Sequence, residues 1–324
     1  MTLWLFRRLL QAAVIVLAMS VIVFVGLHVI GDPVELLVSP EATQAERARI
    51  IASLGLDRPL WQQYLAFLTD AVQGNLGNSF VYNQPALSLV FSRMPATLEL
   101  AFGAMLLAIF IGIPLGLYAG MRPNGALSRA IMLGSVLGFS LPTFWVGLVF
   151  IMFFSVQLGW LPSSGRGDTV RVLGIEWSFL TLDGLRHMAL PVLNLALFKI
   201  SMVLRLTRAG TQEVLAMDYV KFAHAKGLSP RRIILVHVLK NLLIPIVTIV
   251  GLEFGSLIAF AVVTESIFAW PGMGKLIIDS IYVLDRPVVV AYLMMVVMMF
   301  VIINLVVDLL YAAIDPRVRS GGRT

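Results

Sequence analysis

The 324-residue sequence contains no cysteine, which excludes disulfide bonds, thiolate metal sites and cysteine nucleophiles. It also carries little charge, because only 13% of its residues are charged and a soluble domain has about 25%. The four histidines (His28, His187, His224 and His237) are too scattered to predict a metal site. The Gly-x-x-x-x-Gly-Lys-Ser/Thr signature of ATP-binding loops is missing as well. The chain therefore offers no recognisable nucleotide site of its own.

What the sequence has in abundance is apolar side chains. They make up 59% of the residues, and the mean hydropathy of +0.92 predicts an all-α integral membrane protein. The net charge of +6 is typical of a basic cytoplasmic rim in such a protein and does not indicate nucleic-acid binding. The first apolar run, residues 9–30, is too long for a signal peptide and has no cleavage site after it, so we expect it to remain as a helix.

Six apolar runs are long enough to cross a membrane, since a spanning helix needs about 20 such residues. They cover residues 9–30, 96–120, 130–158, 187–207, 242–264 and 288–313. The third run is too long for one straight span, and Pro142 inside it predicts a kink or a break.

Orientation follows from lysine and arginine in the flanks, which favour the cytoplasmic side. With the N-terminus inside, the inner segments hold 14 basic residues and the longer outer segments hold nine. Apart from Arg205, which lies at the inner end of the same run and is counted with the inner segment, Lys199 is the one basic residue left inside a predicted span. We therefore expect both termini to face the cytoplasm.

Residues 31–95 form the one sizeable segment predicted outside the membrane on the outer side. The stretch EATQAERARIIASLGL predicts a short helix that ends at Gly55, and Asp57 is expected to cap a second helix that begins at Pro59. This small helical cap either packs over the first spanning helix or forms a docking surface for an external partner.

The stretch DYVKFAHAKGLSPRR, from residue 218, interrupts the hydrophobic chain with a short basic segment. Its pattern places Tyr219, Phe222 and Ala223 on one helical face, with Gly227 ending the helix in a left-handed turn. Ser229 is then expected to cap a new helix at Pro230 that runs into the membrane. On these residues alone, the segment is either an interfacial amphipathic helix or a knob for docking a protein.

The longer segment DYVKFAHAKGLSPRRIILVHVLKNLLIPIVT resembles the cytoplasmic loop of permease subunits of bacterial ATP-binding-cassette importers, in particular the first permease of the dipeptide, oligopeptide and nickel group. Only Ala223, Gly227 and Leu239 match the wider superfamily pattern letter for letter, but AxAKGLS followed by two basic residues is typical of the peptide group. Other pieces agree in order along the chain: LGLDRPLWQQYLAFL, GNLGNSF, RMPATLELA, FSLPTFWVG, LGWLPSSG, TESIFAWPGMGKL and VDLLYAAIDPRVR.

The resemblance implies six transmembrane helices in the type I importer permease fold, with a small helical periplasmic excursion after the first helix. It divides the chain into residues 1–95 (first helix and cap), 96–313 (five-helix transmembrane domain with a coupling loop at about 213–232) and 314–324 (cytoplasmic tail). The protein is then expected in the bacterial inner membrane.

The same resemblance implies a complex with a second homologous permease, two cytoplasmic ATPase subunits and a periplasmic or lipoprotein substrate-binding protein, in contact with membrane lipid and without nucleic acid. ATP and Mg²⁺ would bind to the partner ATPase, so the chain itself would need no cofactor, no metal and no catalytic residue. The ATPase-coupling residues implied are Tyr219, Phe222, Ala223, Ala225, Lys226, Gly227, Leu228 and Ser229.

Ionisable side chains inside spans are costly and usually functional. Glu253, Glu99 and Asp308 are therefore the candidates for lining the pathway, although hydrogen bonding near the interface is the competing role for Glu99 and Asp308. Glu253 is expected to face water or to be protonated, or else to be a packing contact between the close helices that Gly251 and Gly255 permit. Glu265 and Trp270 are expected at the periplasmic mouth, where tryptophan is a common interfacial anchor.

Two other function classes fit the sequence less well. A stand-alone carrier usually shows internal repeats and several intramembrane ionisable residues, and a membrane enzyme needs a cluster of His, Asp or Glu near one interface. Di- or oligopeptides are the leading substrates by resemblance, with nickel chelates, glutathione and glycosides as alternatives.

Overall fold

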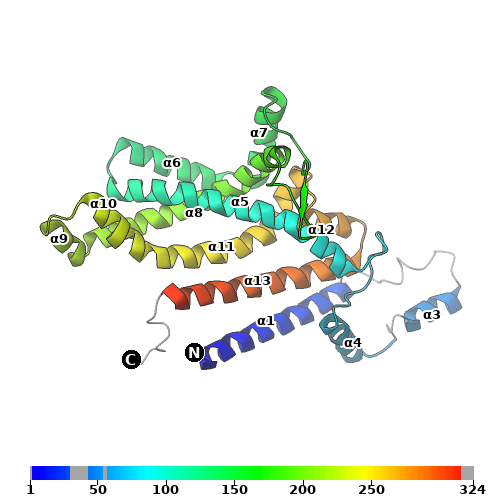
Figure 1. The fold of residues 1–324 in the computed structure, drawn as a ribbon. Coiled ribbons are helices and arrows are strands. Elements are labelled where there is room, and N and C mark those ends of the chain that lie inside the picture. Colours follow the sequence, from blue (N-terminus) through cyan, green and yellow to red (C-terminus); the bar gives the residue numbers. More distant parts are fainter. Residues whose placement is uncertain (1, 30–42, 54–56, 315–324) are drawn as a thin grey trace. The chain divides into compact units, whose positions relative to one another are not determined.

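The computed structural model describes residues 2–29, 43–53 and 57–314, and these residues are almost entirely helical (Figure 1). The expected end of a helix at Gly55 and the cytoplasmic tail from residue 315 lie outside the described residues.

The chain divides into two compact units, and each is described by itself. The first consists of residues 1–92 and 277–301, and the second of residues 93–276 and 302–324. The division at residues 95 and 313 that the resemblance implies stays a prediction.

The helices follow the apolar runs closely but extend beyond them. The first unit contains α1 (Thr2–Val29), α3 (Gln44–Ser53) and α4 (Leu60–Val72). The second contains α6 (Ala126–Ser140), α7 (Thr143–Phe150), α8 (Leu182–Ala216), α9 (Asp218–Ala225), α10 (Pro230–Arg232) and α11 (Leu239–Ile267), with π-helical turns η1 (Ile151–Gln157) and η2 (Ile233–Val238). Three helices contribute residues to both units: α5 (Ala86–Met121), α12 (Met273–Tyr282) and α13 (Arg286–Ile314).

Five of these helices are long and apolar enough to cross a membrane, and the number is six if the bent pair α6 and α7–η1 is counted as one span. The bend between the two parts is 104°. It falls where Leu141 and Pro142 adopt extended backbone angles, because proline has no amide hydrogen to continue the ladder of α6. The predicted break at Pro142 is confirmed.

In the first unit, the helical cap packs on the first helix. The hydroxyl groups of Ser20 on α1 and Tyr64 on α4 are 2.9 Å apart, and Phe24 meets the ring of Tyr64 edge-on with 5.4 Å between centroids. Of the two roles considered for residues 31–95, packing over α1 is therefore seen in the structure for α4. The cap predicted at Asp57 is wrong, because Pro59 occupies the N-cap of α4 and no side chain caps that helix.

In the second unit, α5 and α8 approach each other along small residues. A Cβ atom added to Gly116 would lie 2.6 Å from Thr207 Cβ, and one added to Gly120 would lie 2.5 Å from Thr211 Cβ. Helices in membranes pack closely where glycine recurs every fourth residue, since the backbones can then approach. This contact fixes the long helix α8, from which the basic segment continues.

A two-stranded hairpin is the exception to the helical fold. Strands β1 (Val170–Val172) and β2 (Ile175–Trp177) pair antiparallel, with Val170 opposite Trp177. The turn between them uses positive φ angles at Leu173 and Gly174, which suits the right-handed twist of a short hairpin. Within the second unit, Figure 1 shows this hairpin and α7 at one end of α8 and α11, and α9 and α10 at the opposite end.

Candidate functional sites

The basic segment folds as the sequence predicts, into a helix, a stop and a restart. Helix α9 ends at Ala225, and Gly227 in the turn that follows has a φ of +74°, the left-handed conformation. The amide of Leu228 donates to Ala223 O (3.2 Å) and that of Gly227 to His224 O (2.9 Å), which is the Schellman arrangement. Ser229 Oγ then accepts from Arg232 N (3.4 Å) and caps α10, with Pro230 at its first position.

The segment carries a small hydrophobic core of its own. Val220 and Ala223 of α9 are buried together with Ile233, Val238 and residues of the adjoining helix ends (Val214, Leu242 and Ile246), and Leu228 packs against this cluster. Ala223 is only 5% exposed, so the prediction that it shares one docking face with Tyr219 and Phe222 is wrong. The spacing within α9 could not show that Ala223 is buried, because the side chains that cover it come from η2 and α11, later in the chain.

The exposed face of α9 is formed by other residues of the predicted set. Phe222 is 61% exposed, and the ammonium group of Lys226 lies 4.6 Å from the centroid of its ring. Tyr219 is 40% exposed, and its hydroxyl accepts a hydrogen bond from Asn241 Nδ2 (2.7 Å). Ala225 and Ser229 are exposed as well. The result is an exposed apolar ring beside the positive charge of Lys226 at the end of α9.

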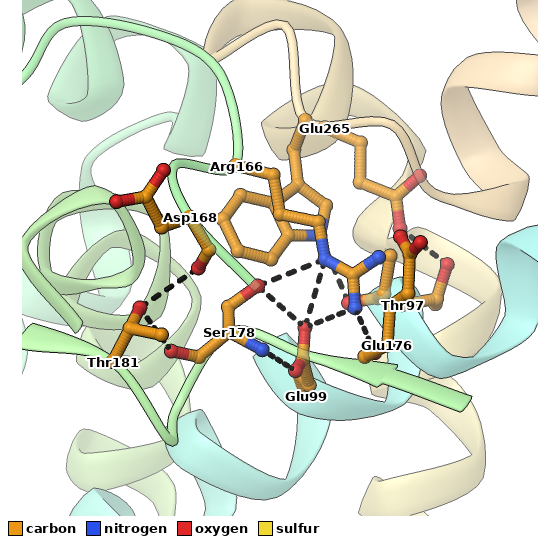
Figure 2. A network of polar contacts seen from close by, with 10 residues as sticks. Thr97, Glu99, Arg166, Asp168, Glu176, Ser178, Thr181 and Glu265 are labelled. Atoms are coloured by element: carbon orange, nitrogen blue, oxygen red, sulfur yellow. Dashed lines mark hydrogen bonds and ion pairs between the residues drawn. The ribbon is translucent and has the colours of Figure 1, made fainter. Parts of the chain in front are cut away.

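A second polar site surrounds Glu99 near the start of the membrane part of α5 (Figure 2). The side chain of Glu99 is fully buried and accepts from Arg166 Nη2 (2.9 Å) and from Ser178 N (2.5 Å). Arg166 also donates to Ser178 Oγ (2.9 Å) and to Glu176 O (2.7 Å). A buried carboxylate that accepts from an arginine and from a backbone amide makes charge-assisted hydrogen bonds, and losing either partner would leave an uncompensated buried charge. Glu99 therefore holds the hairpin segment, in agreement with its predicted role in hydrogen bonding.

Glu265 lies beside this site in the same unit (Figure 2), and the ring centroid of Trp270 lies 5.9 Å from Arg166 Cζ. Glu265 is fully buried, and its carboxylate accepts from Thr97 Oγ1 (2.7 Å) and Lys275 N (2.9 Å). Thr97 Oγ1 in turn accepts from Met273 N (2.8 Å), so the cluster joins α5, α11 and the start of α12.

Trp270 does not have the exposure of an interfacial anchor. It is fully buried, and its indole nitrogen donates to Ala96 O (2.9 Å). An anchoring role at the membrane surface is therefore wrong for this side chain. The position of Glu265 and Trp270 at the periplasmic mouth stays a prediction.

The third polar site lies halfway along two spanning helices. Lys199 Nζ on α8 donates to the carboxylate of Glu253 on α11 and to Ser256 Oγ (2.8 Å). Ser256 Oγ is also 3.0 Å from Glu253 Oε2. A charge at mid-membrane costs about 2.5–3.5 kcal/mol on insertion scales, and an ion pair with a third polar partner offsets that cost.

The structure gives Glu253 an ion-pair partner, Lys199, that none of the expected roles included, and the expectation that Glu253 faces water or is protonated stays a prediction. The side chain of Glu253 is 24% exposed and that of Lys199 is 10% exposed. Asp308 on α13 is half-buried, beside Val307, which lines an apolar cavity of about 420 Å³ with residues of α5 and α11. The locations of Glu253, Glu99 and Asp308 do not show whether they line the pathway, so that role stays a prediction for all three.

Sequence reasoning missed the partners of these acidic residues. Arg166 and Ser178 lie in a segment that the sequence predicts only as an outer loop. Lys199 is predicted inside a span, but without Glu253 as its partner. The useful signal was present for Lys199, since one acid and one base at similar depths in two spans indicate a pair. No comparable signal in the sequence indicated that Arg166 reaches Glu99.

Comparison with known families gives two adjoining matches. Residues 112–320 match the family described as binding-protein-dependent transport system inner membrane component. Residues 1–101 match the N-terminal region of the binding-protein-dependent transport system membrane component. Together the two matches cover nearly the whole chain.

Individual proteins are similar over the same length. The di/tripeptide transport system permease protein DppB of Pseudomonas aeruginosa is 41% identical over 302 residues, covering 89% of this chain and 90% of the relative. The glutathione transport system permease protein GsiC of Escherichia coli O6:H1 is 38% identical and covers 97% of both chains. A solved inward-facing MetNI methionine ABC transporter matches with a TM-score of 0.54 and 17% identity, covering 71% of this chain and 98% of that one, which shows a shared fold.

Proposed function

Because the chain belongs to the family of binding-protein-dependent transport system inner membrane components, we propose that it forms half of the translocation pathway of an ATP-driven importer of small peptides. The observation that carries the proposal is the exposed ring of Phe222 on a helix whose opposite face packs into a buried hydrophobic cluster. Aromatic side chains are enriched in protein contacts, and α9 exposes Tyr219 as well as Phe222.

In this account α9 and the turn at Gly227 dock into a cytoplasmic ATPase subunit. The chain has no ATP-binding signature, so ATP and Mg²⁺ bind to two such subunits and the permease is not an enzyme. A second, homologous permease supplies the other half of the pathway, and an external binding protein delivers the substrate. ATP binding closes the ATPase subunits and opens the pathway outward, and hydrolysis returns it to the inward-open state.

The orientation follows from the distribution of basic residues. The N-terminus, the short loop between α5 and α6, and α9 lie on the same side of the membrane when the bent pair is one span. This side carries 14 basic residues against nine, which supports a cytoplasmic location for α9 and for both termini.

The substrate class is inferred from the relatives. One is named for di- and tripeptides and another for glutathione, which is itself a modified tripeptide. Both names support a short peptide as the cargo, and glutathione is the second candidate.

Affinity purification of the chain from cells that co-express its partners tests the assembly. We expect the chain to bring down a second permease and an ATPase. Phe222→Asp should lose the ATPase and keep the second permease, since a carboxylate replaces the apolar contact.

Phe179→Asp is the matched control, because Phe179 is 45% exposed and lies in the segment between the bent pair and α8, away from α9. It should retain all partners. A chain that purifies alone, or a Phe222→Asp variant that keeps its ATPase, would argue against docking through α9.

A further inference from the structure

We infer that Lys199 and Glu253 are positioning residues that join α8 and α11 into one rigid lever, which carries the movement of the basic segment across the membrane. The inference rests on the proposed function, because it assumes that an ATPase moves α9. It begins from the connectivity: α8 leads directly into α9, and η2 leads directly into α11. A displacement of the segment between them is therefore applied to both helices at once.

Contacts at three depths tie these two helices together. At the end next to α9, Gly210 on α8 lies so close to Leu242 on α11 that a Cβ atom would overlap the leucine side chain. Halfway along, Lys199 is paired with Glu253 and Ser256. At the far end, Asn194 Nδ2 donates to Thr264 Oγ1 (3.0 Å), and both side chains are buried.

The middle contact is the one that opposes sliding. Apolar side chains give two helices in a membrane no hydrophobic preference for one axial position, because lipid and protein are equally apolar, and leave that choice to packing and polar contacts. Separating Lys199 from Glu253 instead leaves two charges without partners at mid-membrane. The pair therefore resists axial movement of α11 along α8. Ser256 Oγ contacts both charged groups and so helps to hold them in one arrangement.

The far end of the lever reaches the buried cluster of α5 and α12. Thr264 is followed directly by Glu265, which binds Thr97 and the amide of Lys275. Figure 1 shows α9 at one end of α8 and α11, and Figure 2 shows the Glu265 cluster with the hairpin segment held by Glu99. A rigid pair of helices thus links the proposed ATPase contact to the polar cluster at the opposite end.

Distances between two spin labels, measured by double electron–electron resonance, test the rigidity of the α8–α11 pair without any transport assay. The absence of native cysteine allows spin labels at Leu185 on α8 and Leu252 on α11, which are both exposed, and the helix rise places their levels roughly 20 Å apart. We expect one narrow distance distribution in the otherwise unaltered protein, a distribution at least ~2-fold broader in Glu253→Gln, and a narrow one again in the charge-swapped variant Lys199→Glu/Glu253→Lys. Equal widths in all three proteins would overturn the inference.

The same variants in the reconstituted complex test coupling. Glu253→Gln should raise the amount of ATP hydrolysed per substrate imported by ~10-fold, and the charge swap should return this ratio to within ~2-fold of the unaltered complex. If the charge-swapped variant keeps the high ratio of Glu253→Gln and its substrate preference also changes, Glu253 is a substrate contact and the inference of a rigid lever is wrong. If the unaltered complex shows no ATP-driven uptake while the distances behave as expected, the proposed function fails and the rigid pair stands.

Discussion

At the scale of single residues, Gly227 is the position where backbone conformation alone decides the identity. Its φ is +74°, and apart from its two chain neighbours no residue has an atom within 4 Å of the place where a Cβ would be. We expect Gly227→Val to destabilise the turn by about 1–2 kcal/mol, because side chains with a Cβ disfavour this conformation. Uptake should fall while the amount of protein in the membrane is unchanged, as measured by transport and by immunoblotting of membranes.

Gly134→Val is the control for this substitution. Gly134 lies in α6 with nothing within 4 Å of its Cβ position and no positive φ, so transport should be retained. Transport that is normal in Gly227→Val as well would mean that the turn is not used for coupling and that α9 is only a lipid-facing helix.

The acidic residues show how far single positions can be interpreted from sequence. Composition and depth identified Glu99 and Glu253 as unusual, and both prove to be held by polar partners. What the sequence lacked was the partner, because Arg166 and Glu99 are brought together by the fold of a segment with no periodic pattern. The pairing of Lys199 with Glu253, by contrast, was open to prediction, because consecutive spans run antiparallel and the two residues lie at similar depths in them.

At the scale of helices, the contact between α5 and α8 depends on the glycines at 112, 116 and 120. We expect Gly120→Ala to destabilise the protein by about 1–3 kcal/mol, because the added Cβ would lie 2.5 Å from Thr211 Cβ and 3.0 Å from Arg208 O. Thermal unfolding of the purified protein measures the change. Gly26→Ala, in α1 with nothing within 4 Å, should leave the transition unchanged; an equal shift in both variants would contradict the close packing.

The start of α3 is expected to respond to acid. Thr43 and Glu46 form a capping box, in which Thr43 N and Oγ1 donate to Glu46 Oε2 (2.9 Å each). These hydrogen bonds lower the pKa of the Glu46 carboxyl below its ordinary value. A lowered folded-state pKa means that the carboxylate stabilises the helix at neutral pH and that this contribution is lost as the pH falls through the folded-state pKa.

Amide hydrogen exchange in the first turn of α3 measures this effect. Exchange should accelerate in acid beyond the intrinsic pH dependence of an unfolded chain, and Glu46→Gln should remove the acceleration. An unaltered protein and a Glu46→Gln variant with the same pH profile would contradict the capping box.

Much of the helical arrangement was predictable, because apolar periodicity and proline act locally. The break at Pro142 and the turn at Gly227 followed from the chemistry of one residue each. The end of α8 could not be predicted in this way, since the helix continues to Ala216 through polar sequence that is typical of a loop. The π-helical turns η1 and η2 could not be predicted either, because such a turn depends on tertiary packing and has no simple sequence signature.

At the scale of the whole molecule, the orientation in the membrane is the first prediction to test. Asn75, before α5, and Asn124, between α5 and α6, are both exposed and are separated by one span. Cysteine at residue 75 should react with a membrane-impermeant maleimide in intact cells with a permeable outer envelope, and cysteine at residue 124 only after lysis. Reaction of residue 124 from outside would reverse the proposed topology.

The central claim is that this chain moves small peptides only as part of an ATP-driven assembly. Proteoliposomes that contain the chain, the second permease and the ATPase subunits test it most directly, with labelled dipeptide, external binding protein and enclosed ATP. The account predicts uptake that requires both ATP and the binding protein and that falls at least ~10-fold in Phe222→Asp, the equivalent of about 1.4 kcal/mol of lost coupling. Uptake by the chain alone, driven by an ion gradient without ATP, would contradict the account.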